Sequence, residues 1–72
     1  MIGVDYMVYT IYYTATYRNV KADETLIYKF PITDDSGAHC DELAGYYAEW
    51  ILEELSQSGF ILENLERSYN NE

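Results

Sequence analysis

Residues 41–58, DELAGYYAEWILEELSQS, are predicted to form an amphipathic helix that organises the fold. At about 100° per residue, its apolar residues share one broad side. These are Leu43, Ala44, Tyr47, Ala48, Ile51 and Leu55. Gly59 is expected to end the helix, because glycine adopts a positive φ without a Cβ clash. Ser36 and Asp41 are alternative N-caps, since either side chain can accept a hydrogen bond from a free amide of the first turn.

The opposite side of this helix is acidic, with Glu42, Glu49 and Glu53 clustered there. Tyr46 and Trp50 lie at the border between the two sides. They are either boundary residues that cover the rim of the core or half of a partner-binding patch, since Tyr and Trp are enriched at protein interfaces. Glu54 falls inside the apolar arc, where a charged residue is unusual for a helix that packs on a core.

A long β-strand is expected at residues 5–17, DYMVYTIYYTATY, because the stretch is rich in Tyr, Thr, Val and Ile and contains no Gly or Pro. Its odd positions are the more apolar, and we assign them to the core. They are Met7, Tyr9, Ile11, Tyr13 and Ala15. The even positions, which include Tyr6 and Tyr12, then face outward and form a second candidate contact surface.

A second strand is expected at residues 25–33, TLIYKFPIT, where Leu26, Tyr28 and Phe30 share a face. Pro31 lacks an N–H, so it marks the end of this strand or an edge position. The polar residues 18–24 connect the two strands, which favours an antiparallel hairpin.

The last segment, residues 60–69, fits both a helix and a strand, because Ile61, Leu65 and Tyr69 recur at intervals of four. We favour a strand in which these three residues are buried, since the chain turns back after Gly59. The predicted fold is a single α+β domain of residues 1–72 with ββαβ order. In it, a small antiparallel sheet has one amphipathic helix packed across one face.

The net charge of −9 is concentrated in the second half of the chain. Residues 1–33 hold three acidic and three basic residues, whereas residues 34–72 hold ten acidic residues and a single basic one, Arg67. A protein that binds directly to nucleic acid or to an anionic membrane usually has a net positive charge, the opposite of this chain. The expected partner is therefore a basic protein surface, with no direct contact to nucleic acid or membrane.

Sequence motifs for catalysis or cofactor binding are weak. His39 and Cys40 are adjacent, so on a helix they point about 100° apart, which is poor geometry for a nucleophile and its base. The spacing of Asp34, Asp35, His39 and Asp41 matches neither a calcium loop nor a zinc site. We therefore expect no enzyme, no cofactor and no metal. Cys40 is expected to be a small buried or half-buried thiol.

The expected location is the cytoplasm. The N-terminus has no positive region and an early Asp5, which does not suit a signal peptide. No run approaches the roughly 20 apolar residues of a membrane span. A lone cysteine also fits a reducing compartment.

The strand DYMVYTIYYTATY and the helix DELAGYYAEWILEELSQS make the chain short, acidic and Tyr-rich. In this profile it resembles small phage-encoded inhibitors of host defence, the anti-CRISPR and anti-restriction proteins. The resemblance implies a non-enzymatic inhibitor, in part a nucleic-acid mimic, that acts in the host cytoplasm. Such a protein blocks a nucleic-acid-binding surface of a host defence complex.

Charge and exposed aromatics together select the candidate partner-binding residues. They are Asp41, Glu42, Tyr46, Glu49, Trp50, Glu53 and Tyr12. The alternative function is a small structural or assembly module, in which exposed Tyr and Trp form a homodimer or hetero-complex interface. In that case the acidity serves only solubility.

Overall fold

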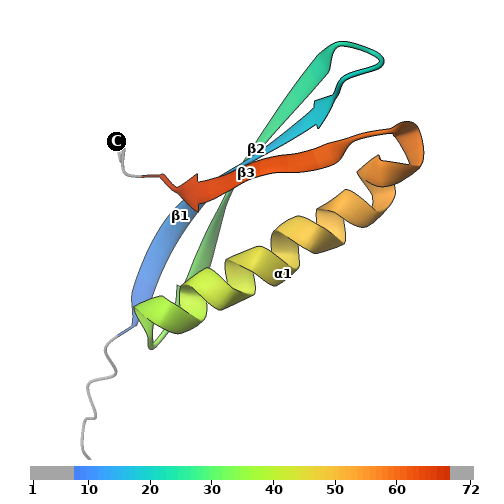
Figure 1. Ribbon diagram of the computed structural model, residues 1–72. Helices are drawn as coiled ribbons and strands as arrows, with labels where there is room; N and C mark the ends of the chain where they lie inside the picture. Colours follow the sequence, from blue (N-terminus) through green and yellow to red (C-terminus); the bar gives the residue numbers. More distant parts are fainter. Residues whose placement is uncertain (1–7, 69–72) are drawn as a thin grey trace, which may run out of the picture.

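The computed structural model describes residues 8–68, in which one helix lies across one face of a twisted three-stranded sheet (Figure 1). The elements follow in the order β1 (Tyr9–Asn19), β2 (Glu24–Asp34), α1 (Gly37–Leu55), a 3₁₀ turn (Ser56–Ser58) and β3 (Ile61–Arg67). The strand order is β2-β1-β3, and both pairings are antiparallel. The predicted ββαβ fold is therefore confirmed, including a strand for the ambiguous last segment.

The central strand β1 separates a buried face from an open one by simple alternation. Tyr13, Ala15 and Tyr17 are at most 2% exposed beneath α1, which confirms that odd positions face the core. Tyr9, at the start of the strand, is 45% exposed, and Tyr12 on the open face is 54% exposed. The predictions for Tyr6, Met7 and Tyr69 fall outside the described residues.

The hairpin between β1 and β2 closes through residues 20–23, where Asp23 adopts a positive φ of 56°. Arg18 supports the turn through an ion pair with Asp23 at 2.8 Å. Pro31 lies within β2 opposite Tyr12, and β2 is an edge strand. The predicted edge position of Pro31 is thus confirmed, since an edge tolerates a residue that cannot donate to a neighbouring strand.

The pairing of β3 with β1 contains a β-bulge. Thr16 is opposite Asn64, but the next residue, Tyr17, is opposite Leu62. One extra residue on β3 reverses the alternation on either side of it. Leu62 therefore packs against the core, while Ile61 turns to the open face and is 57% exposed. The predicted burial of Ile61 is wrong, because it assumed an unbroken alternation.

The helix α1 begins at Gly37, directly after the earlier of the two predicted caps. Ser36 is its N-cap, and the Ser36 hydroxyl accepts a hydrogen bond from the backbone N–H of His39 at 3.2 Å. Of the two alternative caps, the structure selects Ser36, and Asp41 lies inside the helix. Gly59 has the predicted positive φ, +98°, but it closes the 3₁₀ turn Ser56–Ser58, because α1 itself already ends at Leu55.

The fully buried residues of α1 are small, whereas its larger Ile51, Leu52 and Leu55 pack against the core and are partly buried. Cys40, Ala44 and Ala48 are all 0% exposed and recur every four residues. Small side chains let the helix lie close to the sheet, where tyrosines fill the space. The Tyr17 hydroxyl donates a 2.7 Å hydrogen bond to the backbone carbonyl of Ala48. The expectation of a buried Cys40 thiol is confirmed. No helix in residues 8–68 is long and apolar enough to cross a membrane.

Candidate partner-binding face of α1

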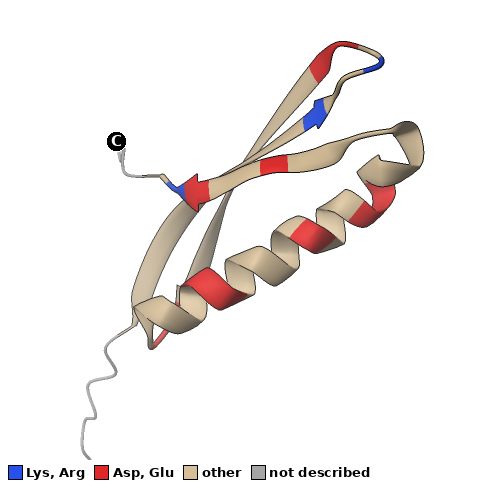
Figure 2. Ribbon diagram, viewed as in Figure 1, with Lys and Arg blue, Asp and Glu red and all other residues tan. Residues whose placement is uncertain are grey.

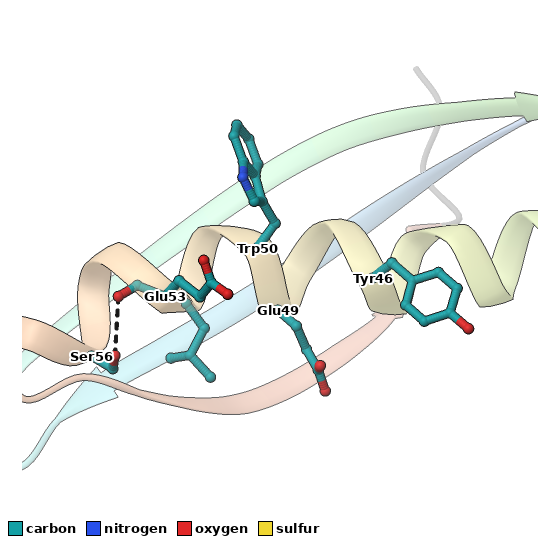
Figure 3. Close-up of a pocket in the computed structure, with 6 residues that line it drawn as sticks. Tyr46, Glu49, Trp50, Glu53 and Ser56 are labelled. Atoms are coloured by element: carbon teal, nitrogen blue, oxygen red, sulfur yellow. Dashed lines mark hydrogen bonds between the residues drawn. The ribbon is translucent and has the colours of Figure 1, made fainter.

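The solvent side of α1 carries two large aromatic side chains, Tyr46 and Trp50 (Figure 3). Each is 65% exposed, and both lie opposite the buried stripe that contains Ala44 and Ala48. Both side chains are therefore largely exposed, and Trp50 keeps a ring contact with Tyr47 at the edge of the core. The two interpretations that the sequence left open, boundary residues or part of a partner-binding patch, are both compatible with this placement.

Trp50 stands between two shallow grooves. The first has a volume of about 530 Å³ and is lined by Tyr46, Glu49, Trp50, Leu52, Glu53 and Ser56 (Figure 3). The second has a volume of about 250 Å³ and is lined by Tyr28, Trp50, Ile51, Glu53, Glu54 and Leu55. Trp50 and Glu53 line both grooves. We define the acidic-aromatic face as Tyr46, Glu49, Trp50, Glu53 and Glu54.

The indole of Trp50 is connected to the core by a series of ring contacts. Its centroid lies 5.7 Å from the ring of Tyr47, and the Tyr47 ring meets Phe30 edge-on at 4.6 Å. Phe30 in turn stacks on Tyr13 at 5.9 Å. Such aromatic pairs add roughly 0.5–1.5 kcal/mol each beyond the area they bury. Trp50 is therefore exposed to solvent on one side and in contact with Tyr47 on the other.

The glutamates of this face have no counter-ions among the described residues. Within residues 8–68, ion pairs engage Asp23, Asp34 and Asp41, and none engages a glutamate of α1. Figure 2 shows acidic residues spaced along α1, which contains no Lys or Arg. The negative field of this side is thus uncompensated and directed into solvent.

Asp41, a predicted partner-binding residue, is engaged inside the molecule. Its two carboxylate oxygens each lie 2.9 Å from a guanidinium nitrogen of Arg67, and one accepts a 2.5 Å hydrogen bond from the Tyr13 hydroxyl. The hydrogen bonds from Arg67 and then Tyr13 hold the pKa of Asp41 below its usual value. Burial, followed by the neighbouring Asp41 carboxylate, raises the pKa of Tyr13 to about 12. Asp41 therefore ties α1 to β1 and β3.

The structure brings most of the predicted partner-binding residues together. Glu42, Tyr46, Glu49, Trp50 and Glu53 share the solvent side of α1 by helical spacing. Tyr12 does not join them, because it lies on the open face of the sheet, on the far side from α1.

Six residues that line the grooves were not predicted as partner-binding: Tyr28, Ile51, Leu52, Glu54, Leu55 and Ser56. Glu54 was recognisable as a charge inside the apolar arc, and a charge there indicates a side chain that the core does not use. Tyr28 was predicted only to share a face of β2 with Leu26 and Phe30. It is 40% exposed, because β2 lies at the edge of the sheet.

His39 and Cys40 occupy different environments. The Nδ1 atom of His39 lies 2.8 Å from Asp34, and this partner raises the pKa of His39. The Cys40 thiol is buried and donates a long 3.8 Å hydrogen bond to the Ile32 carbonyl, and burial raises its pKa. A raised pKa keeps the thiol protonated, which is the less nucleophilic form. Residues 8–68 contain no cluster of three side chains suited to a metal ion.

Comparisons of the chain with protein families, curated proteins and solved structures gave no match. An inference about a partner therefore rests on the chemistry of the acidic-aromatic face. An exposed indole attracts cations to its ring face, and free carboxylates accept hydrogen bonds from Lys or Arg. Both features are chemically complementary to a cation.

Proposed function

We propose that this protein binds a basic, nucleic-acid-binding surface of another protein and blocks it. The observation that carries the proposal is the exposed, ring-supported Trp50 among glutamates that have no counter-ions in the described part of the chain. Surfaces that hold nucleic acid are lined with Lys and Arg, and they present the complementary charge.

Charge and aromatic contact have separate parts in this proposal. Carboxylates steer the encounter and raise the association rate, whereas buried aromatics supply most of the lasting contact energy. The glutamates alone are a sparse copy of a nucleic acid, since duplex DNA carries a charge about every 1.7 Å of its axis. In this proposal the contacts of Trp50 and Tyr46 supply the affinity that the widely spaced glutamates alone do not.

The resemblance to anti-CRISPR and anti-restriction proteins extends the proposal to one class of target. In this extension the blocked surface belongs to a host defence complex, and the protein is an inhibitor without catalytic activity. The acidic half of the chain then occupies the channel or groove that otherwise holds DNA or RNA.

The test is capture of partners from a bacterial lysate at low and at high salt, with identification by mass spectrometry. We expect nucleic-acid-binding proteins that are released by high salt and displaced by added DNA. The E49K/E53K variant should lose them. The E24K/E63K variant, which changes the net charge equally at two exposed positions off the helix, should retain them. Retention by E49K/E53K, or capture that DNA does not displace, would contradict the proposal.

A second candidate function, self-assembly, is favoured by the open face of the sheet. Tyr12, Ile27 and Ile61 lie on it and are 54%, 61% and 57% exposed. A particle with the mass of two chains that persists at high salt, and that Ile27→Lys converts to one chain, would support this candidate. A single-chain mass at all salt concentrations would leave only the first proposal.

A further inference from the structure

The surroundings of Trp50 point to one kind of side chain on the partner. Glu53 and Glu54 follow Trp50 by three and four residues, so both are its neighbours on the helix surface, with Cβ atoms about 5–6 Å apart. The three residues line one groove together with Tyr28 and Leu55. An exposed ring and two carboxylates thus converge on a single small volume.

We propose that Trp50 is the stacking platform for an arginine side chain of the partner, with Glu53 and Glu54 accepting hydrogen bonds from its guanidinium group. This inference rests on the proposed function and specifies the contact that a basic partner makes. Glu49, on the other side of Trp50 in the larger groove, then faces a neighbouring cation of the same surface.

Arginine fits this arrangement better than lysine because of its shape. The guanidinium is planar, stacks on aromatic faces and offers parallel N–H groups that match a carboxylate. Tryptophan is the best aromatic partner for a cation, and arginine is the commoner cation in such pairs. A lysine ammonium can pair with Glu53 or Glu54, but as a compact point charge it does not cover the indole.

Other occupants fit the face less well. A second copy of α1 and a nucleic acid both bring negative charge against Glu49, Glu53 and Glu54. A purely apolar segment buries these carboxylates without a partner, and desolvating an unpaired charge is strongly unfavourable. A cationic, planar side chain satisfies the ring and the carboxylates at once.

The support beneath Trp50 makes the platform ready for binding. Contact with Tyr47, itself packed on Phe30, restricts the indole before a partner arrives. A side chain that is already restricted loses less rotamer freedom on binding, so more of the contact energy appears as affinity.

The test compares octa-arginine with octa-lysine, two peptides of equal charge, by calorimetry and by the fluorescence of Trp50, the chain's one tryptophan. We expect octa-arginine to bind roughly two- to fivefold more tightly, the effect of a cation–π contact at an exposed site. Its binding should also change the Trp50 emission. Trp50→Leu should bring the two affinities to the same value while retaining binding to both peptides.

A matched pair of double variants tests the carboxylates. E53Q/E54Q and E24Q/E63Q remove the same charge, so general attraction falls equally in both. We expect E53Q/E54Q alone to remove the preference for arginine. Circular dichroism spectra and thermal midpoints equal to those of the unmodified chain show that the variants are folded.

Equal affinity for the two peptides with unchanged Trp50 emission would overturn the inference and leave the proposed function standing. An arginine preference that survives Trp50→Leu would overturn it as well. The proposed function fails by a different result, the retention of captured proteins by E49K/E53K.

Discussion

The two sides of α1 use side-chain size in opposite ways. Its fully buried residues are Cys40, Ala44 and Ala48, whereas Tyr46 and Trp50 on its solvent side are each 65% exposed. Large apolar side chains are usually the ones that folding places inside. Here the large fully buried residues come from the sheet and from Phe60, whereas the fully buried residues of the helix are small. Tyr46 and Trp50 are therefore not needed to fill the core, which is why we connect them with binding.

The strongest test of this comparison removes a large residue from beneath the helix. Tyr17→Ala should lower the free energy of unfolding by about 3–5 kcal/mol, the usual loss for a buried aromatic. A chain of this length has a total stability of roughly 4–11 kcal/mol, so the variant should be largely unfolded or close to it. Urea unfolding followed by circular dichroism measures the change.

Tyr17→Phe is the matched control, because it keeps the ring and deletes the hydroxyl that donates to the Ala48 carbonyl. It should lose about 1 kcal/mol, plus a further penalty if the carbonyl stays unpaired. A Tyr17→Ala midpoint close to that of the unmodified chain would show that the close helix–sheet contact is not the main source of stability.

A smaller effect is expected from enlarging the buried side of the helix. Ala48→Leu should lower the free energy of unfolding by about 1–3 kcal/mol, because extra methylenes force the helix away from Tyr17. Ala38→Leu is the control, since Ala38 lies in the same helix but is exposed, and it should change stability by less than about 0.5 kcal/mol. Equal losses in the two variants would mean that the spacing between helix and sheet is not fixed by small residues.

The sequence predicted these two sides well where a local pattern determined them. Alternation identified Tyr13 and Ala15 as core residues, and helical spacing identified the apolar Ala44 and Ala48 and the acidic outer row. The prediction of a strand rather than a helix for the last segment, which forms β3 at residues 61–67, was also correct, because the turn at Gly59 returns the chain to the edge of the sheet.

Features set by distant contacts were not predictable in the same way. The pairing of Asp41 with Arg67 joins residues 26 positions apart, so nothing local distinguishes Asp41 from the free glutamates after it. The bulge in β3 depends on how the strand fits against Thr16 and Tyr17, and it exposed Ile61. Tyr12 is a different case, because its even position already placed it on the outward face of the strand, away from the helix, and it was still grouped with the helix residues.

The Asp41 cluster gives a pH test of residues at the edge of the core. The pKa of Asp41 is lowered in the folded state, so its contribution is present above the ordinary Asp pKa near 4 and is lost as the pH falls through the folded value. The pKa of Tyr13 is raised to about 12, so its contribution is present below pH 10 and lost as the pH rises from about 10 to 12. Stability should therefore fall at both extremes.

Asp41→Asn tests whether Asp41 causes the loss of stability at low pH. At neutral pH it should be less stable than the unmodified chain, because Arg67 loses its ionised partner, and the two stability curves should converge as the pH falls. Glu63→Gln, at an exposed position without an ion pair among the described residues, should keep a constant offset. Parallel curves for Asp41→Asn and the unmodified chain would contradict the role of Asp41 in holding α1.

The smallest expected effect on stability is the most informative about function. Trp50→Ala removes the largest side chain of α1, yet at 65% exposure it should lower the free energy of unfolding by only about 0.5–1.5 kcal/mol, the contribution of its ring contact with Tyr47. The same variant should lose the preference for octa-arginine. Tyr47→Ala is the opposite case, because Tyr47 packs on Phe30 and supports Trp50, so it should reduce stability and binding together. If Trp50→Ala destabilised the chain as much as Tyr47→Ala, the indole would belong to the core, and the contrast between the two sides of α1 would no longer indicate a binding surface.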